Sequence, residues 1–143
     1  MGVIVGPRVI DAGFSLASVL LAPVAVAAGY PSPAQDYFDG RIDLNEHLIK
    51  DVTSTYVVRV TGQSMEGAGI SDGDELIVNR ALEPKDGSVV VAVLDGELTI
   101  KRLRITSRGV VLQADNPAFP DITVAALSEL TIWGVATTCL HHV

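Results

Sequence analysis

Short runs of alternating apolar and polar residues follow one another from residue 55 onward, with turn residues between them. Such runs are rich in β-branched residues, which is typical of strands. The expected strands cover residues 55–60, 74–79, 88–94, 97–105, 110–114 and 131–137. The pattern therefore predicts a mostly β domain. We expect a curled, barrel-like antiparallel sheet, because curling hides strand edges from other chains.

Aspartate-glycine pairs mark several breaks between these runs, at residues 72–73, 86–87 and 95–96. The pair Asp95-Gly96 predicts a tight hairpin between the runs 88–94 and 97–105, because both central residues of the favoured turn take positive φ. Asp72, Asp74 and Glu75 are expected to cap backbone amides and not to act in catalysis. The turn Asp115-Asn116-Pro117 is assigned no chemistry.

The residues before this domain follow a different pattern. Residues 1–28 end in an almost wholly apolar run of small side chains and are predicted to form an extended N-terminal arm. Residues 29–54 form a linker, because Pro31 and Pro33 favour extended backbone. One or two helical turns are expected near Asp43. The β domain then spans residues 55–143.

The apolar arm also allows a second interpretation, in which it is a secretory signal peptide. Residues 25–27 read Ala-Val-Ala, the small-x-small form that signal peptidases accept. The chain would then be an exported β-domain binding protein with no catalysis. Arg8 is offset by Asp11 and Pro23 interrupts the apolar run, which weighs against a signal, and the run is too short to span a bilayer.

Composition excludes several classes of function. The 143 residues fit one domain, and ten Lys and Arg against seventeen Asp and Glu give a net charge of −7. We therefore expect no direct contact with nucleic acid and no membrane association. The single cysteine, Cys139, has no disulfide or ligand partner and is expected to be half-buried in a strand. The adjacent His141 and His142 have poor metal geometry, so we expect no metal and no cofactor.

The strongest candidate chemistry lies in Ser64 and Lys101. Ser64 follows a predicted strand and the turn residue Gly62, so its hydroxyl can be presented outward at a corner. Serine needs a base to remove its proton, and Lys101 is the candidate. Lysine can act as a base only when neutral, which burial among apolar neighbours achieves by lowering its pKa. Those neighbours are expected to be Leu98, Ile100 and Leu103. The alternative is a solvated serine and a lysine that points at water.

Five segments between about Gly29 and Gly134 resemble the UmuD proteins, the self-cleaving subunits of an SOS mutagenesis polymerase and relatives of the LexA and phage repressors. The segments are Pro31–Tyr37, Arg41–Asn45, Gly62–Met65, Gly69–Asp74 and Lys101–Leu103. The resemblance implies the β-clip fold that LexA shares with signal peptidase. It also implies a serine endopeptidase with a Ser64 and Lys101 dyad.

The same resemblance implies what the enzyme cuts and where it works. The scissile bond is expected between Ala28 and Gly29, with the backbone N–H groups of Gln63 and Ser64 as the oxyanion donors. The trimmed product is expected to form a homodimer in the cytoplasm and to join a UmuC-like Y-family DNA polymerase. A RecA–single-stranded DNA filament is the expected activator during the SOS response. Only 28 residues precede Gly29, too few for the DNA-reading domain of the repressors.

Two further alternatives keep the β domain but change its chemistry. The chain can be a signal-peptidase-like Ser/Lys protease that acts on other proteins, which requires a membrane anchor. It can also be a catalytically inactive interaction subunit, in which Lys101 is protonated and exposed.

Overall fold

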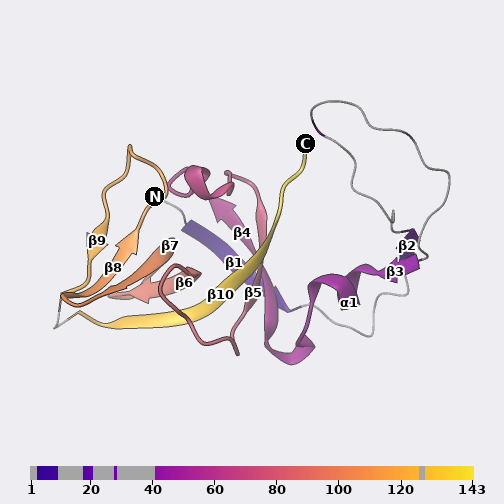
Figure 1. Ribbon diagram of the computed structural model, residues 1–143, viewed down its shortest axis with the longest axis horizontal. Helices are drawn as coiled ribbons and strands as arrows, with labels where there is room; N and C mark the ends of the chain where they lie inside the picture. Colours follow the sequence, from indigo (N-terminus) through magenta and orange to yellow (C-terminus); the bar gives the residue numbers. More distant parts are fainter. Residues whose placement is uncertain (1–2, 10–17, 21–27, 29–40, 126–127) are drawn as a thin grey trace. The chain divides into compact units, whose positions relative to one another are not determined.

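The computed structural model describes residues 3–9, 18–20, 28, 41–125 and 128–143 (Figure 1). Two compact units account for the contacts: residues 1–10 with 51–143, and residues 11–50. The functional division into an arm, a linker and a β domain remains a prediction.

One antiparallel sheet of eight strands forms the larger unit. Its strands are β1 (Val3–Val9), β4 (Thr55–Thr61), β5 (Glu75–Asn79), β6 (Val89–Leu94), β7 (Glu97–Thr106), β8 (Gly109–Gln113), β9 (Ile122–Thr123) and β10 (Leu130–Leu140). Two short 3-10 helices, η1 (Val52–Ser54) and η2 (Glu66–Ala68), stand before and after β4.

The sheet is curled and not flat. Its strand order is β1-β4-β5-β10-β6-β7-β8-β9, so β1 and β9 are the edge strands. β1 nevertheless contacts β7, although other strands separate the two in this order. The curl brings the end of β4 and the middle of β7 to the same region (Figure 1). The prediction of a mostly β, curled antiparallel fold is confirmed.

The smaller unit contains two short paired strands and one helix. β2 (Ser18–Leu20) pairs antiparallel with β3 (Arg41–Asp43), and α1 (Leu44–Leu48) follows β3 directly. The helix agrees with the expected one or two turns near Asp43. It is short because few apolar residues recur at helical spacing in this stretch.

All six predicted strands are present, with ends that differ by a few residues. The sequence pattern missed β1, β2, β3 and β9. β1 was missed because its sequence, Val-Ile-Val-Gly-Pro-Arg-Val, carries a glycine and a proline at its centre, which are unfavourable inside a strand. Its pairing with β4 shifts register between Ile4 and Pro7, at these two residues. β9 is only two residues long and leaves no pattern.

The predicted hairpin at Asp95-Gly96 is confirmed. β6 and β7 pair antiparallel from Leu94 with Glu97 onward. Asp95 has φ of 49° and Gly96 has φ of 84°, so both turn residues are in the left-handed region. This turn fixes the register of β7, because each residue of a two-residue hairpin has a set partner. Val90 is thereby paired with Lys101.

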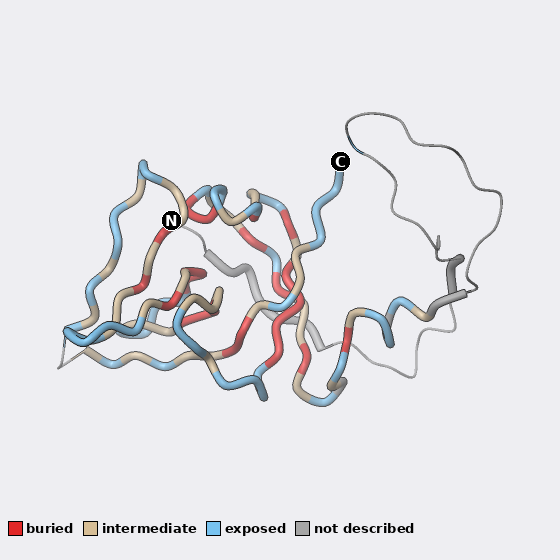
Figure 2. The backbone as a smooth tube through the Cα atoms, in the orientation of Figure 1, coloured by how far each residue is buried: buried red, intermediate tan, exposed pale blue. Residues whose placement is uncertain are grey.

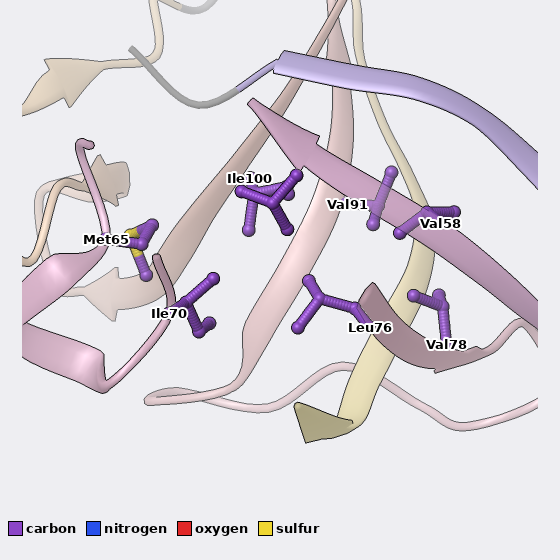
Figure 3. Close-up of a cluster of buried hydrophobic side chains, with 8 residues drawn as sticks. Val58, Met65, Ile70, Leu76, Val78, Val91 and Ile100 are labelled. Carbon is purple, nitrogen blue, oxygen red and sulfur yellow. The ribbon is translucent and has the colours of Figure 1, made fainter. Parts of the chain in front are cut away.

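Two hydrophobic clusters form the interior of the sheet. Figure 2 shows in red the buried stretches of the backbone. The first cluster is shown in Figure 3 and consists of Val58, Val60, Met65, Ile70, Leu76, Val78, Val91 and Ile100. The second cluster consists of Val90, Ala92, Leu103, Leu112 and Val135. Every member of both is at most 8% exposed, so the curled sheet has a well-formed interior.

Cys139 lies half-buried on β10, as expected. Its thiol Sγ lies 3.2 Å from Oδ2 of Asp74 and donates to it. Burial, together with the neighbouring Asp74 carboxylate, raises the pKa of the Cys139 thiol to about 11. The thiol therefore remains protonated at neutral pH and is a poor nucleophile.

The described residues contain no helix that is both long and apolar enough to cross a bilayer. The same residues contain no group of three or more His, Cys, Asp or Glu side chains that are arranged to hold a metal ion.

Gly134 generates a prediction about the sheet. It lies at a register shift between β10 and β6, where an added Cβ would stand 2.6 Å from Cγ1 of the fully buried Val78. We expect Gly134→Ala to lower the free energy of unfolding by about 1–3 kcal/mol, because the core has no room for the methyl group. Urea denaturation measures the change.

Val78→Ala provides the control, because it removes the atom that the new methyl group meets. The losses in the double variant should be less than additive. Strict additivity would contradict the proposed clash.

Candidate active site

Ser64 lies in the turn between β4 and η2, three residues after β4 ends at Thr61. Gly62 has φ of 92°, a conformation that residues with a side chain rarely adopt, and this turns the chain sharply. The N–H of Gly62 donates to Oδ1 of Asp72 at 2.7 Å. The Ser64 side chain is fully buried and its Oγ lies at Nζ of Lys101, so the expectation of an outward-facing hydroxyl is wrong.

Asp72 and Asp74 act as predicted, as acceptors for backbone amides. The N–H of Ser71 donates to Oδ2 of Asp74 at 2.7 Å. Asp74 is buried, and its other oxygen accepts from Nδ1 of His141 at 2.5 Å. These bonds lower the pKa of Asp74 even though burial opposes them. The two carboxylates thus fix the backbone at Gly62 and at Ser71 by hydrogen bonds.

Core residues adjacent to Ser64 and Lys101 anchor both of them. Met65 follows Ser64, Ile100 precedes Lys101, and both belong to the first hydrophobic cluster (Figure 3). Met65 is 2% exposed and Ile100 is fully buried. Because a packed interior resists displacement, these two anchors hold the backbone on either side of the site.

Lys101 lies in the middle of β7 and is only 2% exposed. Its Nζ lies 3.0 Å from Oγ of Ser64, 3.1 Å from Oγ1 of Thr99 and 3.1 Å from the carbonyl oxygen of Ile100. The interpretation in which this lysine points at water is therefore wrong. The interpretation as an inactive subunit assumed an exposed Lys101, and that assumption is wrong on the same ground.

The surroundings of Lys101 favour the neutral amine. Burial lowers the pKa of Lys101, because the charged form loses its hydration. In the part of the chain that the structure describes, no carboxylate forms an ion pair with it. When the amine is neutral, its two N–H groups can donate to the Ile100 carbonyl and the Thr99 hydroxyl, and its lone pair can accept from the Ser64 O–H at the same 3.0 Å.

The predicted apolar neighbours of Lys101 require one correction. Ile100 and Leu103 are buried, but Leu98 is 38% exposed. Leu98 lies close to the Asp95-Gly96 turn, where β7 leaves the core, so it does not contribute a buried wall. The buried part of the strand begins one residue later, at Thr99.

Thr99 is a site residue that the sequence analysis missed. It precedes Lys101 by two positions on β7, and residues two apart share one face of a strand. Its hydroxyl is buried and lies next to Nζ. The signal was present in the sequence as a polar side chain at i−2 of the candidate base.

The expected cleavage residues lie at the margin of the described chain. Ala28 is exposed and belongs to the smaller unit, whereas Gly29 lies outside the described residues. Gln63, an expected oxyanion donor, is exposed and directly precedes Ser64.

Comparisons with known proteins identify the family of the chain. The model of the peptidase S24-like family matches residues 20–137. Protein SamA of Salmonella typhimurium is 41% identical over 114 residues, which are 80% of this chain and 79% of SamA. Protein MucA of Escherichia coli is 40% identical over 116 residues, 80% of this chain and 79% of MucA.

A repressor shows a similar level of identity. The LexA repressor of Delftia acidovorans is 43% identical over 129 residues, which cover 90% of this chain and 57% of the repressor. The resemblance to the UmuD and LexA group is thereby confirmed. The chain is a member of the peptidase S24-like family.

Proposed function

We propose that this chain is a self-cleaving serine endopeptidase that cuts its own Ala28–Gly29 bond. Ser64 is the nucleophile and Lys101 is the general base. One observation carries the proposal: Nζ of a buried lysine lies 3.0 Å from Oγ of a buried serine. Membership of a peptidase family supports the same assignment.

The proposed reaction begins when neutral Lys101 takes the Ser64 proton as Oγ attacks the Ala28 carbonyl carbon. The backbone N–H groups of Gln63 and Ser64 would stabilise the negative oxygen that forms. As the intermediate collapses, the C–N bond breaks and the Lys101 ammonium returns the proton to the Gly29 amine. Water then hydrolyses the ester on Ser64, with Lys101 again as the base.

A substrate within the same chain suits a weakly activated pair of this kind. Tethering the scissile bond to the enzyme removes much of the entropy cost of bringing the reactants together. Part of the N-terminal region already lies along the sheet, because β1 pairs antiparallel with β4 from Tyr56 to Thr61. This supports an arm that binds by strand addition.

The biological role that we propose is processing in the SOS response. The trimmed chain would form a homodimer and serve as a subunit of a UmuC-like Y-family translesion polymerase in the cytoplasm. The activator would be a RecA–single-stranded DNA filament, which would stabilise the conformation with the arm bound. The level of identity to SamA and MucA supports this role.

The principal test is self-cleavage of the purified chain as a function of pH. The rate should rise with pH as Lys101 loses its proton. Because burial lowers the pKa of Lys101, the rate should be half-maximal at a pH below about 10.4, the ordinary pKa of lysine. Mass spectrometry should find a product that begins at Gly29.

Two variants separate this reaction from its rivals. Ser64→Ala and Lys101→Ala should each abolish cleavage. If the arm were removed as a signal peptide, processing in cells would persist in Ser64→Ala, and that result would contradict the proposal. Efficient cleavage of an added peptide would instead favour a protease that acts on other proteins.

A second prediction concerns stability and needs no cleavage, so it uses the Ser64→Ala background. The pKa of Lys101 is lower in the folded chain than in the unfolded chain. At pH values between these two pKa values, the unfolded chain binds a proton that the folded chain lacks. The free energy of unfolding should therefore rise with pH, by up to about 1.4 kcal/mol per unit, until the pH reaches about 10.4. Lys101→Met should remove this slope in urea titrations.

Lys85→Met is the matched control, because Lys85 is exposed. It should leave the slope unchanged. An equal slope in the Lys101→Met variant would show that Lys101 is charged in the folded chain.

A further inference from the structure

We propose that Asn116 is a positioning residue that orients the Ser64 N–H toward the reacting carbonyl oxygen. This inference rests on the proposed function. The Nδ2 group of Asn116 donates to the carbonyl oxygen of Gln63 at 2.7 Å. That carbonyl and the Ser64 N–H belong to the same peptide group, which is planar and rigid. A bond at one end therefore fixes the direction of the other end.

The orientation of the Asn116 amide is determined by two backbone partners. Its Oδ1 accepts from the N–H of Ala118 at 3.0 Å, so its nitrogen must face the Gln63 carbonyl. A flipped amide would place oxygen against oxygen and N–H against N–H. A bond to the carbonyl also polarises the peptide, which strengthens donation from the Ser64 N–H.

Asp115 holds the chain on the other side of Ser64. We call residues 62–67 the nucleophile turn. Its carbonyl oxygen accepts from the N–H of Gly67 at 2.6 Å. A Cβ at Gly67 would collide with this carbonyl, so the close approach depends on glycine. Ser64 thus lies between two attachments to the same loop, one at Gln63 and one at Gly67.

The loop is itself attached to the strand that carries the base. Nε and Nη2 of Arg102 lie 2.9 and 2.8 Å from Oδ2 of Asp115, and Nη1 donates to the Gly87 carbonyl at 2.7 Å. Arg102 is paired with Gln113 across β7 and β8, so Asp115 is its diagonal neighbour on the same face. Consecutive residues of β7 therefore supply the base and the support for the nucleophile turn.

The test measures self-cleavage of the full chain over the pH range. Asn116→Asp keeps the size of the side chain and an acceptor for Ala118 but removes the donor to Gln63. We expect the plateau rate at high pH to fall about 10-fold or more, less than the 10²–10³-fold loss when an oxyanion donor is deleted outright. Asn116→Ala, which adds no charge, should show the same loss.

Gln113→Glu is the matched control, because it makes the same amide-to-carboxylate change on β8. Gln113 accepts from Nε of Arg104 at 2.8 Å and has no part in the proposed chemistry. Its rate should stay within about twofold of the parent rate, because a carboxylate at this position can still accept from Nε of Arg104. The pH of half-maximal rate in Asn116→Asp should equal that of this control, because the base is unchanged.

Each remaining outcome overturns the inference. If both Asn116 variants cleave as fast as Gln113→Glu, Asn116 does not position the Ser64 N–H. The proposed function would still hold in that case, provided that Ser64→Ala abolishes cleavage. A shifted pH midpoint relative to the control would place the effect on Lys101. Loss of a cooperative thermal transition in both variants would assign Asn116 to folding alone. A parent chain with no Ser64-dependent cleavage would overturn the proposed function as well.

Discussion

The structure depends on the burial of one amine against one hydroxyl. Lys101 is 2% exposed, and its hydrogen bonds go to neutral oxygen atoms of Ser64, Thr99 and Ile100. An ammonium at this position would lose its hydration without gaining a counter-ion, so burial lowers the pKa of Lys101 and favours the uncharged form. Hydrophobic packing holds the two residues in place, because their chain neighbours Met65 and Ile100 belong to one buried cluster.

Much of the fold could be predicted from the sequence, because the central strands and the β6–β7 turn are specified by short stretches of the chain. Alternating apolar residues mark the central strands, and Asp95-Gly96 sets the register of β7 through the turn geometry alone. β1 was missed because Gly6 and Pro7 are unfavourable within strands, and only its pairing with β4 makes it one. Strand formation there is a tertiary effect that no local pattern reports.

The candidate site shows the same division. Ser64 and Lys101 carry recognisable residue types in recognisable contexts, and a resemblance linked them. Thr99 could have been predicted, because residues two positions apart in a strand share a face and Thr99 is two positions before Lys101. Asn116 was not, because a turn asparagine normally bonds to its own loop. Its amide does so through Oδ1, and only the folded chain shows that its nitrogen reaches Gln63, 53 positions away.

The pairing of β1 with β4 has a consequence for the chain that the proposed cleavage would leave. While β1 is in place, it hydrogen-bonds to β4 along residues 56–61, so β4 is an interior strand of the sheet. A chain that starts at Gly29 has no β1, and its sheet ends on β4. The main-chain groups of β4 that had faced β1 then have no partner, which is the condition under which a strand recruits another polypeptide. Cleavage would thus remove β1 and also expose β4 as an edge strand, next to the turn that carries Ser64, where another polypeptide can pair with it.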